Sequence, residues 1–297
     1  MKSLLAISVL SLLVLAATLL AFGAHSQTPP SEAKQVRTYL GFDRNGYPGD
    51  EAMKLLRKDF TFTGYWLSPP PGEKTNSWQG KREYLRSLGY GFLPLYRARE
   101  STELKSEEQA QKLGEEDARS TIEAAQRDGF PDGSQIFLDI EEGGRLSPIY
   151  HAYIRGWLWR VAPIPYRGGF YCSGMPVREG RGVTITTADD IYKDLWRRSR
   201  EFAVWVYNDA CPPSPGCSFN ADPPVPSNSG IDIPNVATVW QFAQSPRRKQ
   251  FTARCPAKYA SDGNCYAPTD TAHKWFLDLN SATAPDPSTA QRWPQPK

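Results

Sequence analysis

The feature that most constrains the fold of this chain is a regular alternation of short β-rich runs with helix-forming stretches. Eight runs are expected to form strands: residues 38–42, 60–67, 91–96, 135–140, 168–172, 202–207, 237–242 and 275–279. This number, spread over about 240 residues, predicts a single α/β domain, a (β/α)8 barrel of the TIM type. An open doubly wound sheet is the alternative, but no Gly-rich phosphate-binding loop follows the first run.

The stretches between these runs carry helix signals. The clearest begins at Ser106, which has the spacing of a capping box with Gln109, and small or apolar residues then recur every three or four positions until Gly129. Other helices are expected at residues 51–58, 78–88, 149–161 and 189–200. Residues 211–234 and 245–274 contain many Pro, Gly and Asn residues and are expected to be loops. The barrel is therefore expected to be irregular in its last two β/α units.

The first 26 residues have the composition of a secretory signal peptide. Lys2 precedes an apolar run from Leu4 to Phe22, and small residues surround a cleavage position after Ser26. An uncleaved membrane anchor is the alternative, since the run approaches the length of a spanning helix. We expect an exported protein, either secreted, periplasmic or associated with the cell envelope. The expected organisation is a leader at 1–26, a linker at 27–37, the barrel at 38–280 and a Pro-rich tail at 281–297.

Export would place the five cysteines in an oxidising compartment. Cys211 lies close to Cys217 and Cys255 lies close to Cys265, each pair within a loop, so a local disulfide in each loop is the simplest expectation. Cys172 is then the odd thiol. A zinc site is the alternative, but neither pair has C-x-x-C spacing and histidines are scarce. No metal and no cofactor are expected.

Acidic residues follow four of the eight predicted strands. They are Asp43 after the first, Asp139 and Glu141 at the end of the fourth, Asp209 after the sixth, and Asp278 at the eighth. Enzymes with this fold place their reactive groups at the carboxyl ends of the strands. An ionised carboxylate against a protein core costs several kcal/mol unless it is paired or used. We therefore expect these acids to form a catalytic group.

Asp139 and Glu141 are the sharpest pair among these acids. Residues i and i+2 of a strand point to the same face, about 6.6 Å apart at Cα, so both carboxyl groups can reach one cavity. Like charges at that range raise one pKa, so that one group holds a proton while the other stays ionised. That division suits glycosidic cleavage. The alternative for this motif is a structural ion pair at a strand end. By the same alternation, Glu142 is expected to point to the opposite face of the strand.

Aromatic and amide side chains accompany the acids at the strand ends. The expected substrate contacts are Trp66, Tyr96, Tyr171, Tyr207 and Gln241. Flat rings stack on the apolar faces of sugars, and an amide or phenol can bind their hydroxyl groups. Packing in the core is the alternative for each ring. The basic run Arg247-Arg248-Lys249 is expected to be a solvated loop.

Taken together, the strand ends resemble one family. The pattern consists of Gly41-Phe42-Asp43, Asp139-x-Glu141, Gly169-Phe170-Tyr171, Trp205-Val206-x-x-Asp209, Val239-Trp240-Gln241-Phe242 and Asp278-Leu279-Asn280. It is similar to a bacterial glycoside-hydrolase-like barrel family labelled as a domain of unknown function and related to the family-25 lysozymes (muramidases). The resemblance covers nearly the whole mature chain, residues 38–280.

The resemblance implies a role for each acid. Glu141 matches the proton donor of the lysozymes, and Asp139 matches the acid that assists it. Asp43, Asp209 and Asp278 match the remaining acids, and the substrate's N-acetyl group would supply the nucleophile. The chain departs from the pattern at Arg44–Pro48, where a Ser-containing turn is expected, and in the cysteine-bearing loops after strands six and seven.

Three classes of function remain open from the sequence. The first is a secreted glycosidase acting on amino-sugar polymers such as peptidoglycan, and the second is a non-catalytic carbohydrate or envelope-binding module on the same barrel. The third is a metal-dependent phosphodiesterase, which is disfavoured because the mature chain has only His151 and His273. Catalysis by a Ser or Cys nucleophile is also disfavoured, because the sequence contains no Gly-x-Ser-x-Gly elbow and no convincing His base.

The net charge of +3 recruits neither nucleic acid nor an anionic membrane by itself. The expected partner is a polysaccharide or peptidoglycan-type glycan. Membrane contact is expected only through an uncleaved leader, and the oligomeric state is unknown from the sequence.

Overall fold

The computed structural model describes residues 36–162, 165–180, 182–196, 198, 202–231 and 237–289. The predicted leader, most of the predicted linker and the last residues of the predicted tail lie outside the described residues.

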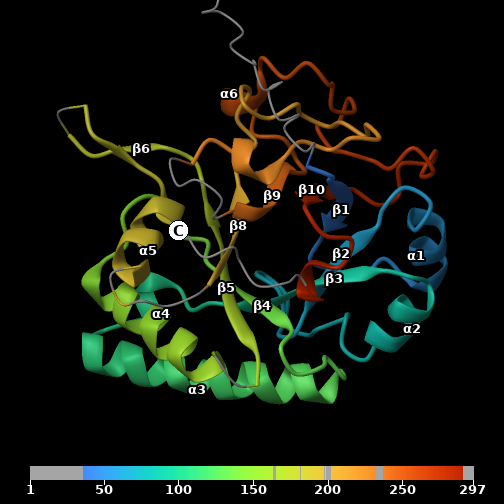
Figure 1. The fold of residues 1–297 in the computed structure, drawn as a ribbon. Coiled ribbons are helices and arrows are strands. Elements are labelled where there is room, and N and C mark those ends of the chain that lie inside the picture. The colour runs from blue at the N-terminus through green and yellow to red at the C-terminus, as the bar shows by residue number, and fades with distance from the viewer. Residues whose placement is uncertain are drawn as a thin grey trace, which may run out of the picture. The chain divides into compact units, whose positions relative to one another are not determined.

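Eight strands form a closed barrel in the order β1-β10-β9-β8-β5-β4-β3-β2 (Figure 1). They are β1 (Tyr39–Asp43), β2 (Phe62–Trp66), β3 (Gly91–Arg97), β4 (Gln135–Asp139), β5 (Arg167–Ser173), β8 (Ala203–Tyr207), β9 (Ala237–Ala243) and β10 (Asp278–Ala282). The prediction of an eight-stranded α/β barrel is confirmed. The first seven barrel strands form within two residues of the predicted runs, because short, nearly continuous apolar and aromatic runs favour strands that are buried on both faces.

Helices follow most of the parallel strands. They are α1 (Asp50–Leu56), α2 (Arg82–Ser87), α3 (Glu107–Arg127), α4 (Pro148–Val161), α5 (Thr187–Trp196) and the short α6 (Lys249–Thr252). A hairpin of β6 (Val177–Arg178) and β7 (Thr184–Ile185) precedes α5, and short 3-10 turns form η1 (Ser101–Glu103), η2 (Pro226–Asn228) and η3 (Pro287–Thr289). Within the described residues, no helix combines the length and apolar character that crossing a membrane requires.

The long helix α3 begins where the capping signal predicts. The Ser106 hydroxyl accepts a hydrogen bond from the Gln109 backbone N–H at 3.2 Å, so the N-terminal cap is formed. α3 and α4 pack closely because glycines lie at their contact. A Cβ at Gly114 would approach the Tyr153 carbonyl to 2.2 Å, and one at Gly156 would approach the Gln111 carbonyl to 2.3 Å.

The eighth strand runs against the rest of the barrel. β10 pairs antiparallel with both β1 and β9, whereas the other barrel strands pair in parallel. The prediction that Asp278 ends the eighth strand is therefore wrong, because Asp278 is its first residue. An antiparallel neighbour can be reached by a loop that stays at one end of the sheet, with no helix crossing back. The amino end of β10 consequently lies at the barrel mouth, the end where the parallel strands finish.

The described part of the predicted tail continues the barrel. β10 extends to Ala282, so the expected boundary at 280 falls within this strand. Beyond it, the Asp286 carboxylate accepts a hydrogen bond from the Phe92 backbone N–H at 3.0 Å. Phe92 lies near the start of β3, so the segment after β10 covers the end of the barrel opposite the mouth.

Two disulfides join the long loops after β8 and β9. Cys211 pairs with Cys255 and Cys217 pairs with Cys265, with Cα separations of 5.0 and 5.6 Å. The prediction of a local disulfide within each loop is wrong. Both loops leave the mouth of the barrel and run alongside each other, and Cys211 N donates to the Phe251 carbonyl at 3.0 Å. Cys172 is the free, buried thiol, as predicted.

Candidate functional site

Carboxyl groups from three strands meet at the mouth of the barrel. Asp43 ends β1 and lies in register with Asp278, the first residue of β10. Asp139 ends β4, and Glu141 follows two residues later. Glu141 raises the pKa of Asp43, Asp139 and Asp278, and Asp43 raises the pKa of Asp139 and Asp278. These four acids therefore act on one another across a shared site, and none of them forms an ion pair with an arginine among the described residues.

Asp43 is held by a chain of buried donors. Its Oδ1 accepts from Gln241 Nε2 at 2.9 Å and from Asn280 Nδ2 at 2.7 Å. Tyr171 donates its phenol proton to Gln241 Oε1, and the Trp205 indole donates to Asn280 Oδ1, each at 2.9 Å. Burial raises the pKa of Asp43 to about 6, while the bonds from Asn280 and Gln241 oppose the rise. Asp43 is thus an oriented carboxyl group that titrates near neutral pH.

Asp139 and Glu141 act on each other's ionisation. Asp139 is 2% exposed, and burial, followed by the charges of Glu141 and Asp43, raises its pKa well above its ordinary value. Glu141 reaches solvent with part of its surface, and the protein around its carboxyl group still desolvates it enough to raise its pKa. No donor in the described residues reaches Asp139 Oδ2. A hydrogen bond between the two acids further raises the pKa of Asp139, and the same bond opposes the rise that burial causes in the pKa of Glu141.

Asp278 completes the group beside Asp43. Its Oδ1 accepts from the Ser245 backbone N–H at 2.6 Å, so the loop after β9 positions this carboxyl group. Burial, followed by the charge of Asp43, raises the pKa of Asp278 well above its usual range. Arg44 also lies near Asp278: burial lowers the pKa of its guanidinium, and the charge of Asp278 opposes that change.

Asp209 is placed differently from the other predicted acids. It is fully buried, and both of its oxygens accept from Arg248, with Arg248 Nε 3.2 Å from Oδ2. Arg248 was expected in a solvated loop, and that expectation is wrong because the loop folds back over the end of β8. Two hydrogen bonds from one guanidinium hold a buried carboxyl group in a fixed orientation. The geometry of Asp209 fits a structural ion pair that anchors the loop after β9.

The residues predicted to contact substrate differ in burial and in their distance from the acids. Trp66 is buried, and its indole donates to the Arg44 carbonyl at 3.2 Å. Tyr171 and Gln241 are buried, and both belong to the series of hydrogen bonds that holds Asp43. Tyr207 is half-buried at the mouth, 5.5 Å from Tyr171 between ring centroids. Of the five residues, Tyr207 is thus the aromatic that stands beside the acids with part of its surface in solvent.

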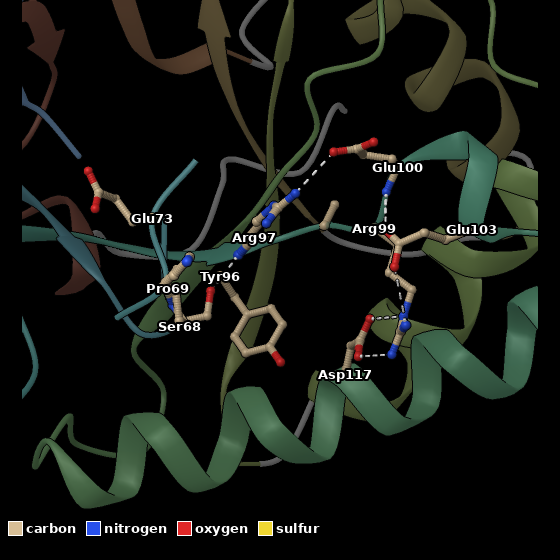
Figure 2. Close-up of a pocket in the computed structure, with 11 residues that line it drawn as sticks. Ser68, Pro69, Glu73, Tyr96, Arg97, Arg99, Glu100, Glu103 and Asp117 are labelled. Carbon is tan, nitrogen blue, oxygen red and sulfur yellow. Dashed lines mark hydrogen bonds and ion pairs between the residues drawn. The ribbon is translucent and has the colours of Figure 1, made fainter. Parts of the chain in front are cut away.

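Tyr96 lies away from the acids. It points from β3 toward α3 (Figure 2). The alternation of side chains along a strand accounts for this placement, because Arg97, the next residue, points to the opposite face. Arg97 lies in register with Asp139, and its charge acts on both Asp139 and Glu141.

Sequence reasoning missed Arg97 and Asn280. Leu93, Leu95 and Arg97 share one face of their strand, so the period of two could have selected Arg97 in place of Tyr96. The same period places Asn280 on the face of Asp278. Its contact with Asp43 depends on the pairing of β10 with β1, for which the sequence carries no local signal. Among the described residues, no group of three or more His, Cys, Asp or Glu side chains is arranged to hold a metal ion.

Comparisons with known proteins place this architecture in a family. The model of the Rv2525c-like, glycoside hydrolase-like domain matches residues 57–219, more than half of the chain. No curated protein matches the chain. An uncharacterized protein of B. stearothermophilus has the same fold, with 19% identity, a TM-score of 0.54, and coverage of 82% of this chain and 95% of that chain.

Two other solved structures are more distant. The Tat-secreted protein Rv2525c of Mycobacterium tuberculosis, in complex with L-tartrate, is 13% identical over 82% of this chain and 94% of that chain, with a TM-score of 0.47. A family GH25 lysozyme from Aspergillus fumigatus is 13% identical over 74% of this chain and 100% of that chain, with a TM-score of 0.39. On the strength of the family model, the chain belongs to the Rv2525c-like, glycoside hydrolase-like domain family.

Proposed function

We propose that this protein is an exported glycoside hydrolase that cleaves an amino-sugar glycan, such as peptidoglycan, by carboxylate acid catalysis. The observation that carries the proposal is the meeting of Asp43, Asp139, Glu141 and Asp278 at the barrel mouth, where Glu141 raises the pKa of the other three acids. Glycosidic cleavage needs a protonated acid beside the leaving oxygen and a negative group near the developing oxocarbenium ion. Acids whose pKa is raised by burial hold a proton to higher pH than free acids do, which serves the first need.

The placement of each acid supports a separate role. Glu141 is the exposed member of the pair, so it is the group that substrate can reach, and it donates the proton to the leaving oxygen. Asp139 lies buried behind it and supplies that proton to Glu141 through their hydrogen bond. Asp43, held on one oxygen by Gln241 and Asn280, faces the developing positive charge with its other oxygen. Asp209 has a structural role, because it anchors the loop after β9 through Arg248. The nucleophile is the acetamido group of the substrate itself.

The test compares two adjacent glutamates in the full-length protein. Glu141→Gln keeps the shape of the side chain but cannot donate a carboxylic proton, so release of reducing ends from peptidoglycan should fall at least about a hundredfold. Glu142→Gln is the matched control, because the Glu142 carboxylate instead accepts from the Ser101 backbone N–H at 2.9 Å. It should retain most of the turnover.

Two results would contradict the proposal. One is turnover in Glu141→Gln equal to that in Glu142→Gln. The other is saturable glycan binding with no hydrolysis by either variant or by the unmodified protein across a panel of amino-sugar glycans. The second result would select the non-catalytic binding module on the same barrel.

A further inference from the structure

A cavity of about 480 Å³ lies at the end of β3, close to the acid group (Figure 2). The loop after β2 and the turn η1 form its walls, and Tyr96 and Asp117 lie where β3 and α3 face each other. It contains none of the four acids at the mouth. Arg97 connects the two sites, because it lines the cavity and its charge acts on Asp139 and Glu141.

Most of the acids that line this cavity already have donors. Asp117 accepts two hydrogen bonds from Arg99, at 2.8 and 2.9 Å. Glu103 accepts from the Glu100 backbone N–H at 2.8 Å, and Glu100 accepts from Arg97 at 3.1 Å. The remaining acid, Glu73, is exposed, and Figure 2 shows its carboxylate pointing away from Arg97. The negative charge of the lining is therefore largely satisfied from within the protein.

Apart from the exposed carboxylate of Glu73, the groups left open in the cavity are donors. Arg97 uses one nitrogen for Glu100, and its other guanidinium N–H groups have no acceptor among the described residues. Lys74 is exposed and has no ion pair within the described chain. Ser68 accepts from the Arg97 backbone N–H at 2.9 Å, which leaves its own hydroxyl proton free to donate. A set of open donors that includes two cations fits an oxyanion.

We propose that this cavity binds a carboxylate carried by the glycan substrate, through Arg97, Lys74 and Ser68. The inference rests on the proposed function and deepens it, since it selects acidic glycans over neutral ones. The carboxylate could belong to a sugar of the glycan or to a peptide attached to it, and both present the same planar group to Arg97.

Binding of a carboxylate at Arg97 would also change the pKa values of Asp139 and Glu141. Burial raises the pKa of Asp139 and of Glu141, and the charge of Arg97 opposes both increases. A ligand carboxylate on Arg97 would offset part of that charge and leave the pair more fully protonated. An acidic substrate would therefore help to keep the catalytic proton in place.

The experiment measures binding separately from turnover, using full-length protein carrying Glu141→Gln. The probes are soluble peptidoglycan fragments with their peptides, the same fragments with the peptides removed enzymatically, and each of these after conversion of its carboxylates to methyl amides. Isothermal titration calorimetry should give a Kd at least roughly tenfold lower for an intact probe than for its amidated partner. If the preference disappears when the peptides are removed, the carboxylate belongs to the peptide. If it remains, the carboxylate belongs to a sugar of the glycan.

Two lysine variants test the site itself. Lys74→Gln should remove most of the preference for the intact probe, while Lys58→Gln, an exposed lysine just after α1, should leave it unchanged. Equal Kd values for intact and amidated probes, or a full preference that survives in Lys74→Gln combined with Arg97→Gln, would overturn the inference. Carboxylate-dependent binding without cleavage by the unmodified protein would contradict only the proposed function. Cleavage without discrimination would contradict only the inference.

Discussion

Asp43 fits at the barrel mouth because the neighbouring position on β2 has no side chain. A Cβ at Gly64 would lie 2.6 Å from the Asp43 Cβ and 3.2 Å from its Cα, distances at which one of the strands must shift. The carboxyl group of Asp43 is positioned by two hydrogen bonds of less than 3 Å, so a small displacement would misalign both. The absence of a side chain at Gly64 is thus required for this position of Asp43.

Gly64→Ala should therefore impair function and stability together. We expect the free energy of unfolding to fall by about 1–3 kcal/mol, because the added methyl group overpacks the strand contact. Turnover should fall as well, since Asp43 moves. Urea denaturation and a reducing-end assay measure the two effects. Gly46→Ala is the control, because no atom lies within 4 Å of a Cβ at that position, and it should change neither property. Equal behaviour of the two variants would show that Gly64 provides no essential space.

At the scale of elements, the reversed strand β10 determines how the mouth is built. Because β10 begins at the mouth, residues 244–277 stay at that end of the barrel between β9 and β10. Two disulfides then join this loop to the one after β8, and the buried pair of Asp209 and Arg248 links the same two segments. The loops replace the helices of the last units of the barrel and support Asp278 through the Ser245 backbone.

Peptide mapping without reduction should recover Cys211 linked to Cys255 and Cys217 linked to Cys265. Removing the second bridge with Cys217→Ser and Cys265→Ser should lower the unfolding free energy by roughly 3 kcal/mol in the chain-entropy model, because with the first bridge intact the second closes a loop of about 16 residues. The melting temperature of the oxidised protein measures this loss, and a reduced sample is the control for mapping. Recovery of Cys211 linked to Cys217 would contradict the observed pairing.

At the scale of the whole molecule, folding brings together acids that would repel one another if all were ionised. The folded protein raises the pKa of Asp43 to about 6 and those of Asp139 and Asp278 well above their usual range. An acid with a raised pKa binds its proton more tightly in the folded state than in the unfolded state. Its contribution to stability is complete below the unfolded pKa and is lost as pH rises through the folded pKa.

Asp43→Asn should consequently stabilise the protein at neutral pH. Relative to the unmodified protein, the variant should gain on the order of 2–3 kcal/mol of unfolding free energy between about pH 4 and pH 7, since it carries no carboxylate to ionise. Denaturation curves measured across this range provide the test. Asp132→Asn, at an exposed position, is the control and should show a constant difference. A constant difference for Asp43→Asn would mean that folding does not shift its pKa.

Local signals predicted much of the fold and part of the site. The Ser106 cap, the strand runs and the shared face of Asp139 and Glu141 all depend on residues a few positions apart, and each of these predictions agrees with the structure. Tyr96 shows how the same signals can be misapplied, because it was chosen for its place at a strand end without regard to the face it occupies. Asp278 was predicted at the mouth for the wrong reason, as its strand runs in the opposite direction.

The sequence by itself determined which segments become strands and helices, because backbone periodicity and helix capping act over a few residues. Only the tertiary structure decided the long-range partners: Cys211 with Cys255, Asp209 with Arg248, and Asn280 with Asp43. These contacts depend on the direction of β10 and on which loops the closed barrel brings side by side. Burial at the closed mouth is also what raises the pKa values of the acids, since desolvation is a property of the assembled site and not of any single residue.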